Sequence, residues 1–264
     1  MKTRSCILLA AVLSLSLASA NAQLGMGGGP GQGPSFGGAT AALFGKNSNF
    51  TATVEVNVKG ATAEPVSMPG KLMLASGLSR FEIDMATIKG GGMPPGAVDQ
   101  MKSMGMDKMV MVTRPDRKLT YLIYPSLKSH TEMPLQDAEA MLPANEFKVE
   151  LTEIGKEAVD SHECVKNKAV VKDSKGAEHT ATLWNATDMK NFPVKIEQSE
   201  GSAVATMLFK EVKLEKPDSG MFEPPKDSTR YESMQAMIQQ VMMKRMSGAG
   251  QGLPPQPSGK KADQ

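Results

Sequence analysis

Cysteine is scarce in this chain, and its scarcity removes one way of stabilising a fold. Only Cys6 and Cys164 are present, and Cys6 lies in an N-terminal segment that we expect to be removed. A single remaining thiol forms no intramolecular disulfide, so stability must come from packing.

The chain also lacks an excess of charge. It carries 30 Lys and Arg against 28 Asp and Glu, and the loss of Lys2 and Arg4 with the N-terminal segment would leave 28 of each sign. The composition therefore excludes a strongly basic surface for nucleic acid or anionic lipid.

Residues suited to catalysis or metal binding are few and scattered. None of the three histidines, His130, His162 and His179, stands in a recognisable catalytic motif. His162 and Cys164 would share one face of a strand, but two ligands do not complete a zinc site. Nucleotide-binding and phosphate-binding glycine motifs are missing. We therefore expect no enzyme activity and no cofactor.

Only one long apolar run is present, at the start of the chain. Residues 6–17 follow the basic start Met1–Arg4 and precede the small residues Ala20 and Ala22. This pattern is typical of a signal peptide, whereas a transmembrane helix needs roughly 20 apolar residues. We expect residues 1–22 to direct export to the periplasm, to be cleaved near Ala22, and to leave no transmembrane span.

Glycine and proline concentrate near the two ends of the remaining chain. Their density predicts a flexible leader over residues 23–45 and a disordered tail over residues 247–264. Between these flanks we expect one β domain over residues 46–228, followed by a methionine-rich helix over residues 229–246.

The dominant period inside this domain is two, which predicts strands. From Phe50 to Val58, apolar side chains alternate with polar ones, as in a strand with one buried face. Residues 119–124 are apolar on both sides, which predicts a central strand covered on each face. Short turns between the segments predict antiparallel hairpins. The predicted strands are 50–58, 66–75, 78–85, 108–113, 118–124, 127–132, 147–154, 163–171, 178–185, 193–199 and 203–212.

Helices are fewer than strands. Apolar residues at helical spacing, with proline and glycine at the boundaries, predict helices over 96–104, 135–142 and 228–246. The expected fold class is therefore α+β, a curved antiparallel sheet with a few helices on its concave face.

Five motifs, in this order and spacing, resemble a known family. They are Arg114–Pro125 with Lys128–Glu132, Gly155–Cys164, Trp184–Asp188, Phe192–Lys195 and Met221–Pro225. Together they resemble the LolA/LolB-like superfamily of periplasmic lipoprotein carriers, and within it a branch of exported bacterial domains, over residues 46 to 231. The resemblance implies an unclosed, half β-barrel whose apolar concave side is covered by helices and receives acyl chains.

The chain departs from the well-known carriers of that superfamily. They are rich in aromatic residues on the concave face, whereas this chain has only eight Phe, three Tyr and one Trp, but 21 Met. Methionine is unbranched and adapts to irregular apolar surfaces. The alternation of the strands nominates the groove-lining residues Leu72, Leu74, Phe81, Ile83, Met109, Met111, Tyr121, Ile123, Leu183 and Met207.

The helices supply a second set of candidates. We expect Met101, Met104, Met234, Met237, Ile238 and Val241 to form an adjustable lid over a hydrophobic ligand, which could be a lipid, an acyl chain or a lipoprotein segment. An alternative hypothesis is a Cu(I)-binding protein, because soft thioethers bind Cu(I), with Met234, Met237 and Met242 as ligands. A third is an envelope scaffold tethered to a protein partner by its Gly/Pro flanks.

Overall fold

The computed structural model describes residues 36–60, 64–90, 95–135, 141–172, 176, 178–200 and 202–249, with the side chains of residues 200 and 244–249 left out. The predicted signal peptide, residues 23–35 of the leader, most of the predicted helix 135–142 and residues 250–264 of the tail lie outside this part of the chain.

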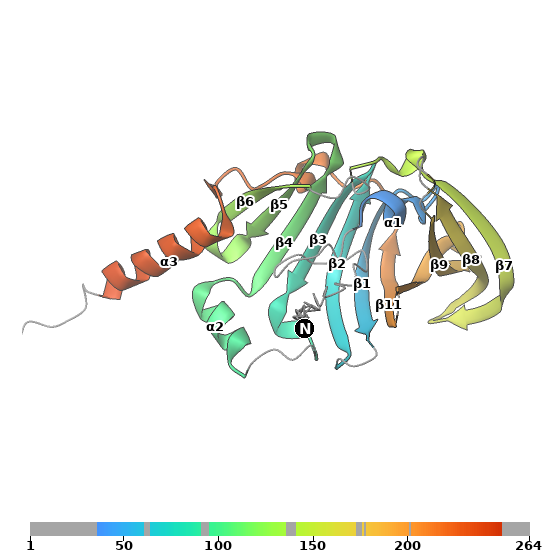
Figure 1. Cartoon of the computed structure of the whole chain (residues 1–264), viewed down its shortest axis with the longest axis horizontal. Helices are drawn as coiled ribbons and strands as arrows, with labels where there is room; N and C mark the ends of the chain where they lie inside the picture. The colour runs from blue at the N-terminus through green and yellow to red at the C-terminus, as the bar shows by residue number, and fades with distance from the viewer. Residues whose placement is uncertain are drawn as a thin grey trace, which may run out of the picture.

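Twelve strands form one sheet (Figure 1). Each of the eleven predicted strands overlaps one of β1 to β11, and β12 was not predicted from the sequence. The strands are β1 (Asn49–Lys59), β2 (Val66–Ala75), β3 (Leu78–Asp84), β4 (Lys108–Arg114), β5 (Leu119–Tyr124), β6 (Ser129–Pro134), β7 (Lys148–Val159), β8 (His162–Lys172), β9 (Glu178–Ala186), β10 (Phe192–Glu200), β11 (Ala203–Lys213) and β12 (Thr229–Tyr231).

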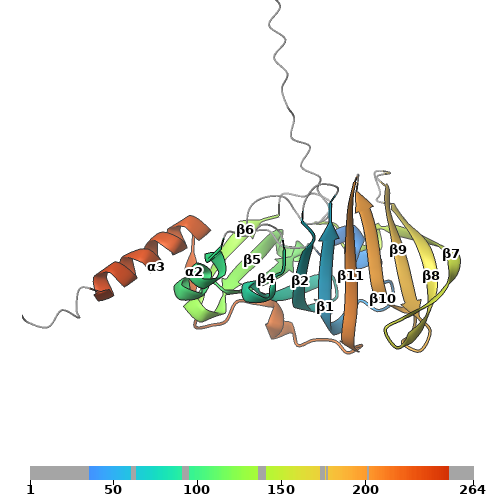
Figure 2. The same cartoon turned by 90° about the horizontal axis from the view of Figure 1, so that it is seen from below.

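The sheet consists of two antiparallel meanders placed side by side. Its order is β12-β6-β5-β4-β3-β2-β1-β11-β10-β9-β8-β7, so β1 pairs with β11 and the two meanders meet there. All pairs are antiparallel except that of β12 with β6, which is parallel. The sheet curves without closing into a barrel (Figures 1 and 2). The α+β half-barrel expected from the sequence is confirmed, with one parallel pair added.

Two apolar clusters lie on the two faces of the sheet. The larger one, called the concave cluster here, contains residues from every strand from β1 to β5 and from β8 to β11. The smaller one, called the outer cluster, consists of Met73, Ala75, Val110, Val112, Tyr121, Ile123 and Phe222. Strand β5 contributes to both clusters, so it is packed on each face as predicted. It is not central, however, because only β6 and β12 separate it from the edge.

The predicted flexible leader ends earlier than the sequence indicates. Helix α1 (Gly38–Ala42) lies against the sheet, and Phe36 and Phe44 on either side of it are 1% and 2% exposed. The ring of Phe44 packs against those of Phe50, Phe192 and Phe209, with centroids 4.8, 5.7 and 5.4 Å away. Aromatic burial therefore outweighs the local preference of glycine for flexibility.

The C-terminal segment passes from the outer face to the concave face. After β11, residues 214–228 cross the outer face, where Phe222 is fully buried in the outer cluster. β12 then pairs along the free edge of β6, and helix α3 (Met234–Ala249) follows. The helix was predicted from residue 228 or 229. It begins at Met234, because residues 229–231 satisfy their backbone hydrogen bonds in the sheet.

Helix α3 projects from the body of the molecule beyond its first turns (Figures 1 and 2). It continues to Ala249, three residues past the predicted end. Among the described residues, no helix is both long and apolar enough to be a candidate membrane span.

Candidate functional site: the methionine half of the concave face

One half of the concave face, on β3 to β6, is lined by methionine. We call it the methionine half. Its buried side chains are Phe81, Ile83, Met106, Met109, Met111, Leu122, Tyr124 and Met237, each no more than 8% exposed.

Strand register brings the side chains of this half together. Met109 pairs with Ile83, and Met111 lies between Phe81 on β3 and Leu122 on β5. Directly paired residues in antiparallel strands point to the same face, with Cβ atoms about 4.5–5.5 Å apart. The register therefore builds a continuous apolar surface across three strands.

Helix α2 (Ala97–Met104) packs along this surface through its methionines. Met101 and Met104 are partly buried against the concave cluster. The helix ends at Gly105, whose φ of +72° is in the left-handed region, and the Met106 N–H donates to the Met101 carbonyl at 2.8 Å. This C-terminal cap satisfies end carbonyls and turns Met106 into the cluster.

Helix α3 covers the same half with its first turn. Met237 is fully buried, and Met234 and Ile238 are partly buried against the concave cluster. Ser233 caps the helix, its Oγ accepting from the Ala236 N–H at 3.1 Å. One turn further on, Met242 is 48% exposed. The docked part of α3 is therefore small.

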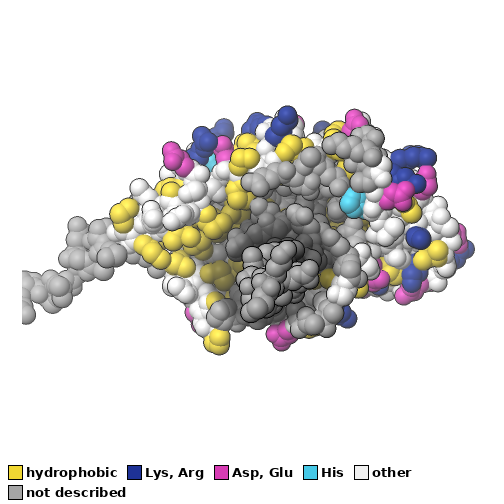
Figure 3. Space-filling view, in the orientation of Figure 1, with side chains coloured by type: hydrophobic (Ala, Val, Ile, Leu, Met, Phe, Trp, Pro, Cys, Tyr) yellow, Lys and Arg dark blue, Asp and Glu magenta, His cyan; other side chains and the backbone are white. Residues whose placement is uncertain are grey.

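Hydrophobic side chains also gather on the surface of this half. In Figure 3 they form a band that runs from the side of α3 toward the middle of the face shown. Contiguous apolar patches on a protein surface often mark binding sites.

One hydroxyl in the methionine half has an unusual environment. Tyr124 is 4% exposed, and burial raises the pKa of its phenol above the ordinary value of 10.0. Its OH donates to the thioether sulfur of Met234 across 4.0 Å. Sulfur is a weak acceptor, so this contact satisfies the donor poorly.

The structure gathers eight of the ten predicted groove-lining residues in the concave cluster: Leu72, Leu74, Phe81, Ile83, Met109, Met111, Leu183 and Met207. The other two, Tyr121 and Ile123, lie on the opposite face in the outer cluster.

The turn between β4 and β5 explains this reversal. Residues 115–118 form a four-residue turn that pairs Arg114 with Leu119, so odd-numbered residues of β4 face even-numbered residues of β5. Leu122 and Tyr124 therefore line the concave face. The length of the Pro115–Lys118 turn was the signal that sequence reasoning did not use.

The predicted lid residues differ in burial and in their contact with the concave cluster. Met237 is buried, while Met101, Met104, Met234 and Ile238 are partly buried against the concave cluster. Val241 is of intermediate exposure and is not part of that cluster.

The three methionines of the alternative copper site lie in different environments. Met237 is fully buried, whereas Met242 is 48% exposed. Five residues apart at about 100° each, they point in directions roughly 140° apart around the helix. Among the described residues, no group of three His, Cys, Asp or Glu could hold a metal ion. The geometry gives the copper hypothesis no support.

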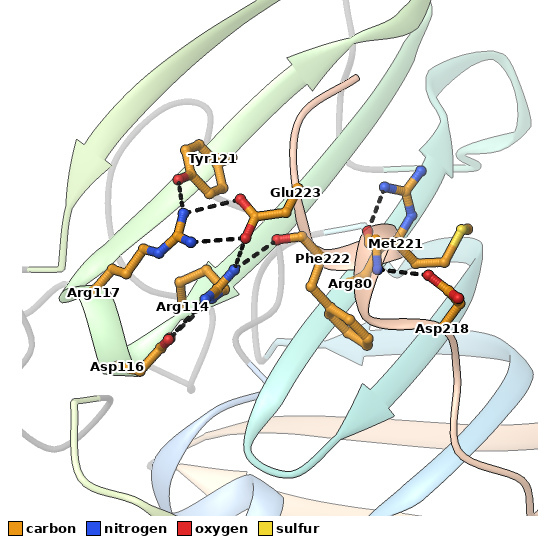
Figure 4. Close-up of polar contacts among 10 residues, drawn as sticks. Arg80, Arg114, Asp116, Arg117, Tyr121, Asp218, Met221, Phe222 and Glu223 are labelled. Carbon is orange, nitrogen blue, oxygen red and sulfur yellow. Dashed lines mark hydrogen bonds and ion pairs between the residues drawn. The ribbon is translucent and has the colours of Figure 1, made fainter. Parts of the chain in front are cut away.

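An ion-pair network on the outer face holds the segment that leads to α3 (Figure 4). Arg114 donates to Asp116 at 2.7 and 2.9 Å, to Glu223 and to the Phe222 carbonyl at 3.3 Å. Arg117 makes a bidentate contact with Glu223, both distances being 2.9 Å. Hydrogen bonds from Arg114 lower the pKa of Asp116. The network fixes the point from which the chain turns to the concave side.

The side chains of the predicted His–Cys pair do not contact one another. The His162 ring bonds Asp188 at 2.8 Å, whereas the Cys164 thiol lies 3.4 Å from the His162 carbonyl oxygen. Burial raises the pKa of the Cys164 thiol, which opposes formation of a reactive thiolate.

Comparison with known proteins gives a fold-level likeness only. No family model matches the chain, and no curated protein matches it. Among solved structures, it is similar to a LolA superfamily protein from Nitrosomonas europaea, with 10% identity, 70% of this chain and 97% of that chain covered, and a TM-score of 0.40. It is also similar to lipoprotein LppX from Mycobacterium tuberculosis, with 11% identity, 66% of this chain and 90% of that chain covered, and a TM-score of 0.37. A third similar structure is LprF from Mycobacterium bovis, with 12% identity, 73% of this chain and 94% of that chain covered, and a TM-score of 0.37.

Proposed function

We propose that this chain is an exported, non-catalytic binding protein that shelters a hydrophobic ligand in the methionine half of its concave face. The ligand class is a lipid, an acyl chain or the acylated segment of a lipoprotein. The observation that carries the proposal is the cover of this half, which consists of methionine-bearing α2 and the first turn of α3.

The chemistry of the lining supports an apolar ligand. Ligand sites are mostly apolar with a few convergent polar groups, and here Tyr124 supplies such a group among methionines. Thioether side chains repack at low cost around ligands of different shape. The half is therefore suited to a flexible chain rather than to one rigid molecule.

The cover is suited to opening. Only the first turn of α3 is docked, through Met237 and its neighbours, so its release exposes little apolar surface compared with unfolding of the sheet. We propose that a ligand enters beneath α2 and α3, and that export places the protein in the periplasm, where acyl ligands are exchanged between membranes.

Titration with a fluorescent fatty acid tests the proposal. Met104→Trp adds bulk beneath α2 in the methionine half and should weaken probe binding by about tenfold or more. Met221→Trp is the matched control, because Met221 is also partly buried but packs against the outer cluster. It should leave the affinity unchanged.

Native mass spectrometry of protein purified from the cell envelope gives an independent readout. We expect co-purifying lipid in the wild type and less of it in Met104→Trp. Absence of lipid together with no saturable probe binding would overturn the proposal. Equal weakening by both tryptophan variants would show that the effect comes from the fold and not from the concave face.

A further inference from the structure

Thr131 on β6 carries a buried hydroxyl without a hydrogen-bond partner. Its side chain is almost fully buried, the residue being 1% exposed, and its Oγ1 is the one buried side-chain N or O atom among the described residues that has no partner. A buried hydroxyl left unsatisfied costs about 1–3 kcal/mol, so such a group calls for an explanation.

The position of Thr131 places this hydroxyl in the methionine half. Thr131 pairs with Leu122, which belongs to the concave cluster, and paired residues share a face. Its neighbour His130 pairs with Ile123 and faces the outer side, where its ring bonds Ser228 at 2.8 Å. The alternation along β6 therefore directs Thr131 to the concave side.

Tyr124 places a second poorly satisfied donor on the same side. It lies two residues from Leu122 on β5 and pairs with Ser129, two residues from Thr131. The two residues are thus diagonal neighbours on one face, with Cα atoms about 7–8 Å apart, a distance that a tyrosine side chain spans. Within the described part of the chain, the Tyr124 hydroxyl has only the Met234 sulfur as its acceptor.

We infer that Thr131 and Tyr124 form a carbonyl-binding pair, and that the ligand of the methionine half is an ester-linked acyl lipid whose carbonyl oxygens accept from these two hydroxyls. The inference rests on the proposed function, because it assigns the ligand class of the same site. A carbonyl oxygen is a stronger acceptor than a thioether and carries no charge into the apolar surroundings.

The contact between the Tyr124 hydroxyl and the Met234 sulfur is consistent with this assignment. Met234 belongs to the first turn of α3, so release of that turn frees the Tyr124 hydroxyl as the ligand enters. In the closed form, the Met234 sulfur is the acceptor that the ligand's carbonyl oxygen replaces. An apolar chain without a carbonyl gains nothing from either hydroxyl.

Two matched lipids test the inference. Dioctanoylphosphatidylcholine carries two ester carbonyls, and its diether analogue has the same headgroup and similar chains without them. We expect the wild type to bind the ester about tenfold more tightly than the ether. Thr131→Val and Tyr124→Phe should each reduce that ratio to about threefold, and the double variant to about one, with ether affinity unchanged.

Two control variants and a stability measurement separate recognition from folding. Thr131→Ser keeps the hydroxyl and should keep the ester preference. Tyr121→Phe removes a hydroxyl that accepts from Arg117 on the outer face, and should also keep it. Thr131→Val should have a thermal midpoint at or above that of the wild type, because it replaces an unsatisfied hydroxyl by a methyl group.

Equal binding of ester and ether by the wild type overturns the inference and leaves the proposed function standing. An ester preference that survives in the double variant also overturns the inference, because groups other than Thr131 and Tyr124 then bind the carbonyl. Binding of neither lipid counts against the proposed function itself.

Discussion

The two halves of the concave face are filled by different chemistry. The rings of Phe50, Phe192 and Phe209 on β1, β10 and β11, and of Phe44 after α1, pack edge to face or tilted and are at most 3% exposed. We call this the aromatic half. On β3 to β6, the methionine half is covered by α2 and α3.

The difference separates a structural region from an adaptable one. Aromatic pairs add about 0.5–1.5 kcal/mol each beyond the burial of their surface, and they fix ring orientation. Thioether side chains have three rotatable bonds and hold no such orientation. The aromatic half therefore anchors the two meanders at the β1–β11 junction, while the side chains of the methionine half can repack more easily.

The largest effect is expected from the aromatic half. Phe50→Ala should lower the free energy of unfolding by about 3–5 kcal/mol, because it leaves a cavity among the three rings of Phe44, Phe192 and Phe209. Met111→Leu, a change of similar volume in the methionine half, should cost less than about 1.5 kcal/mol. Urea denaturation measures both. Equal losses would show that the two halves are equally rigid.

A smaller, local effect is expected from the lid. Met237→Ala removes the one fully buried side chain among those of Met234–Met243, the part of α3 whose side chains are described, and should release the helix without unfolding the sheet. Hydrogen exchange of the α3 amides should become faster, by at least about tenfold for a loss of some 2 kcal/mol in docking. Protection in β1 and β11 should stay the same, and its loss there would contradict a local lid.

The smallest effect concerns pH, at His130 on the outer face of β6. Burial lowers the pKa of His130 below its ordinary value of 6.5, with Glu132 opposing that shift and Arg230 adding to it. The unfolded chain then binds more protons than the folded one, so stability should fall as the pH drops through 6.5 toward the lowered value.

The expected site of this weakening is the pairing of β6 with β12. His130→Gln should flatten the pH profile of thermal unfolding between neutral and mildly acidic pH, and leave the midpoint at neutral pH nearly unchanged. A wild-type profile that is already flat over this range would show that protonation of His130 does not lower the stability of the folded protein.

Much of the fold could be predicted from residue patterns because strands of period two carry a strong local signal. The alternation from Phe50 to Val58 located β1, and the turn residues 115–118 located a hairpin. Strand β12 has only three residues and no alternation, so its pairing with β6 depends on a neighbour about 100 residues away in sequence. The ordered packing of α1 against the sheet likewise depends on phenylalanine rings from strands that are distant in sequence.

The candidate site was predicted in part. Met109 and Met111, which alternation nominated, lie in the concave cluster, whereas Tyr121 and Ile123 lie in the outer cluster, because the turn before each strand sets which of its residues face the concave side. Thr131 was not selected at all. A threonine in a strand is ordinary in sequence, and only the absence of a partner in three dimensions distinguishes it.

By itself, the sequence determined which residues alternate, where the turns fall, and that methionine rather than aromatic side chains would supply much of the apolar volume. The tertiary structure alone decided that Phe44, Phe50, Phe192 and Phe209 gather at the β1–β11 junction while Met106, Met109 and Met111 gather beside β3 to β5. It also decided that the C-terminal segment passes around the sheet edge, so that α3 packs on the methionine half. The physical reason is that periodicity and turn preference act between near neighbours in the chain. The grouping of side chains on a curved sheet is instead set by pairing between strands that are distant in sequence.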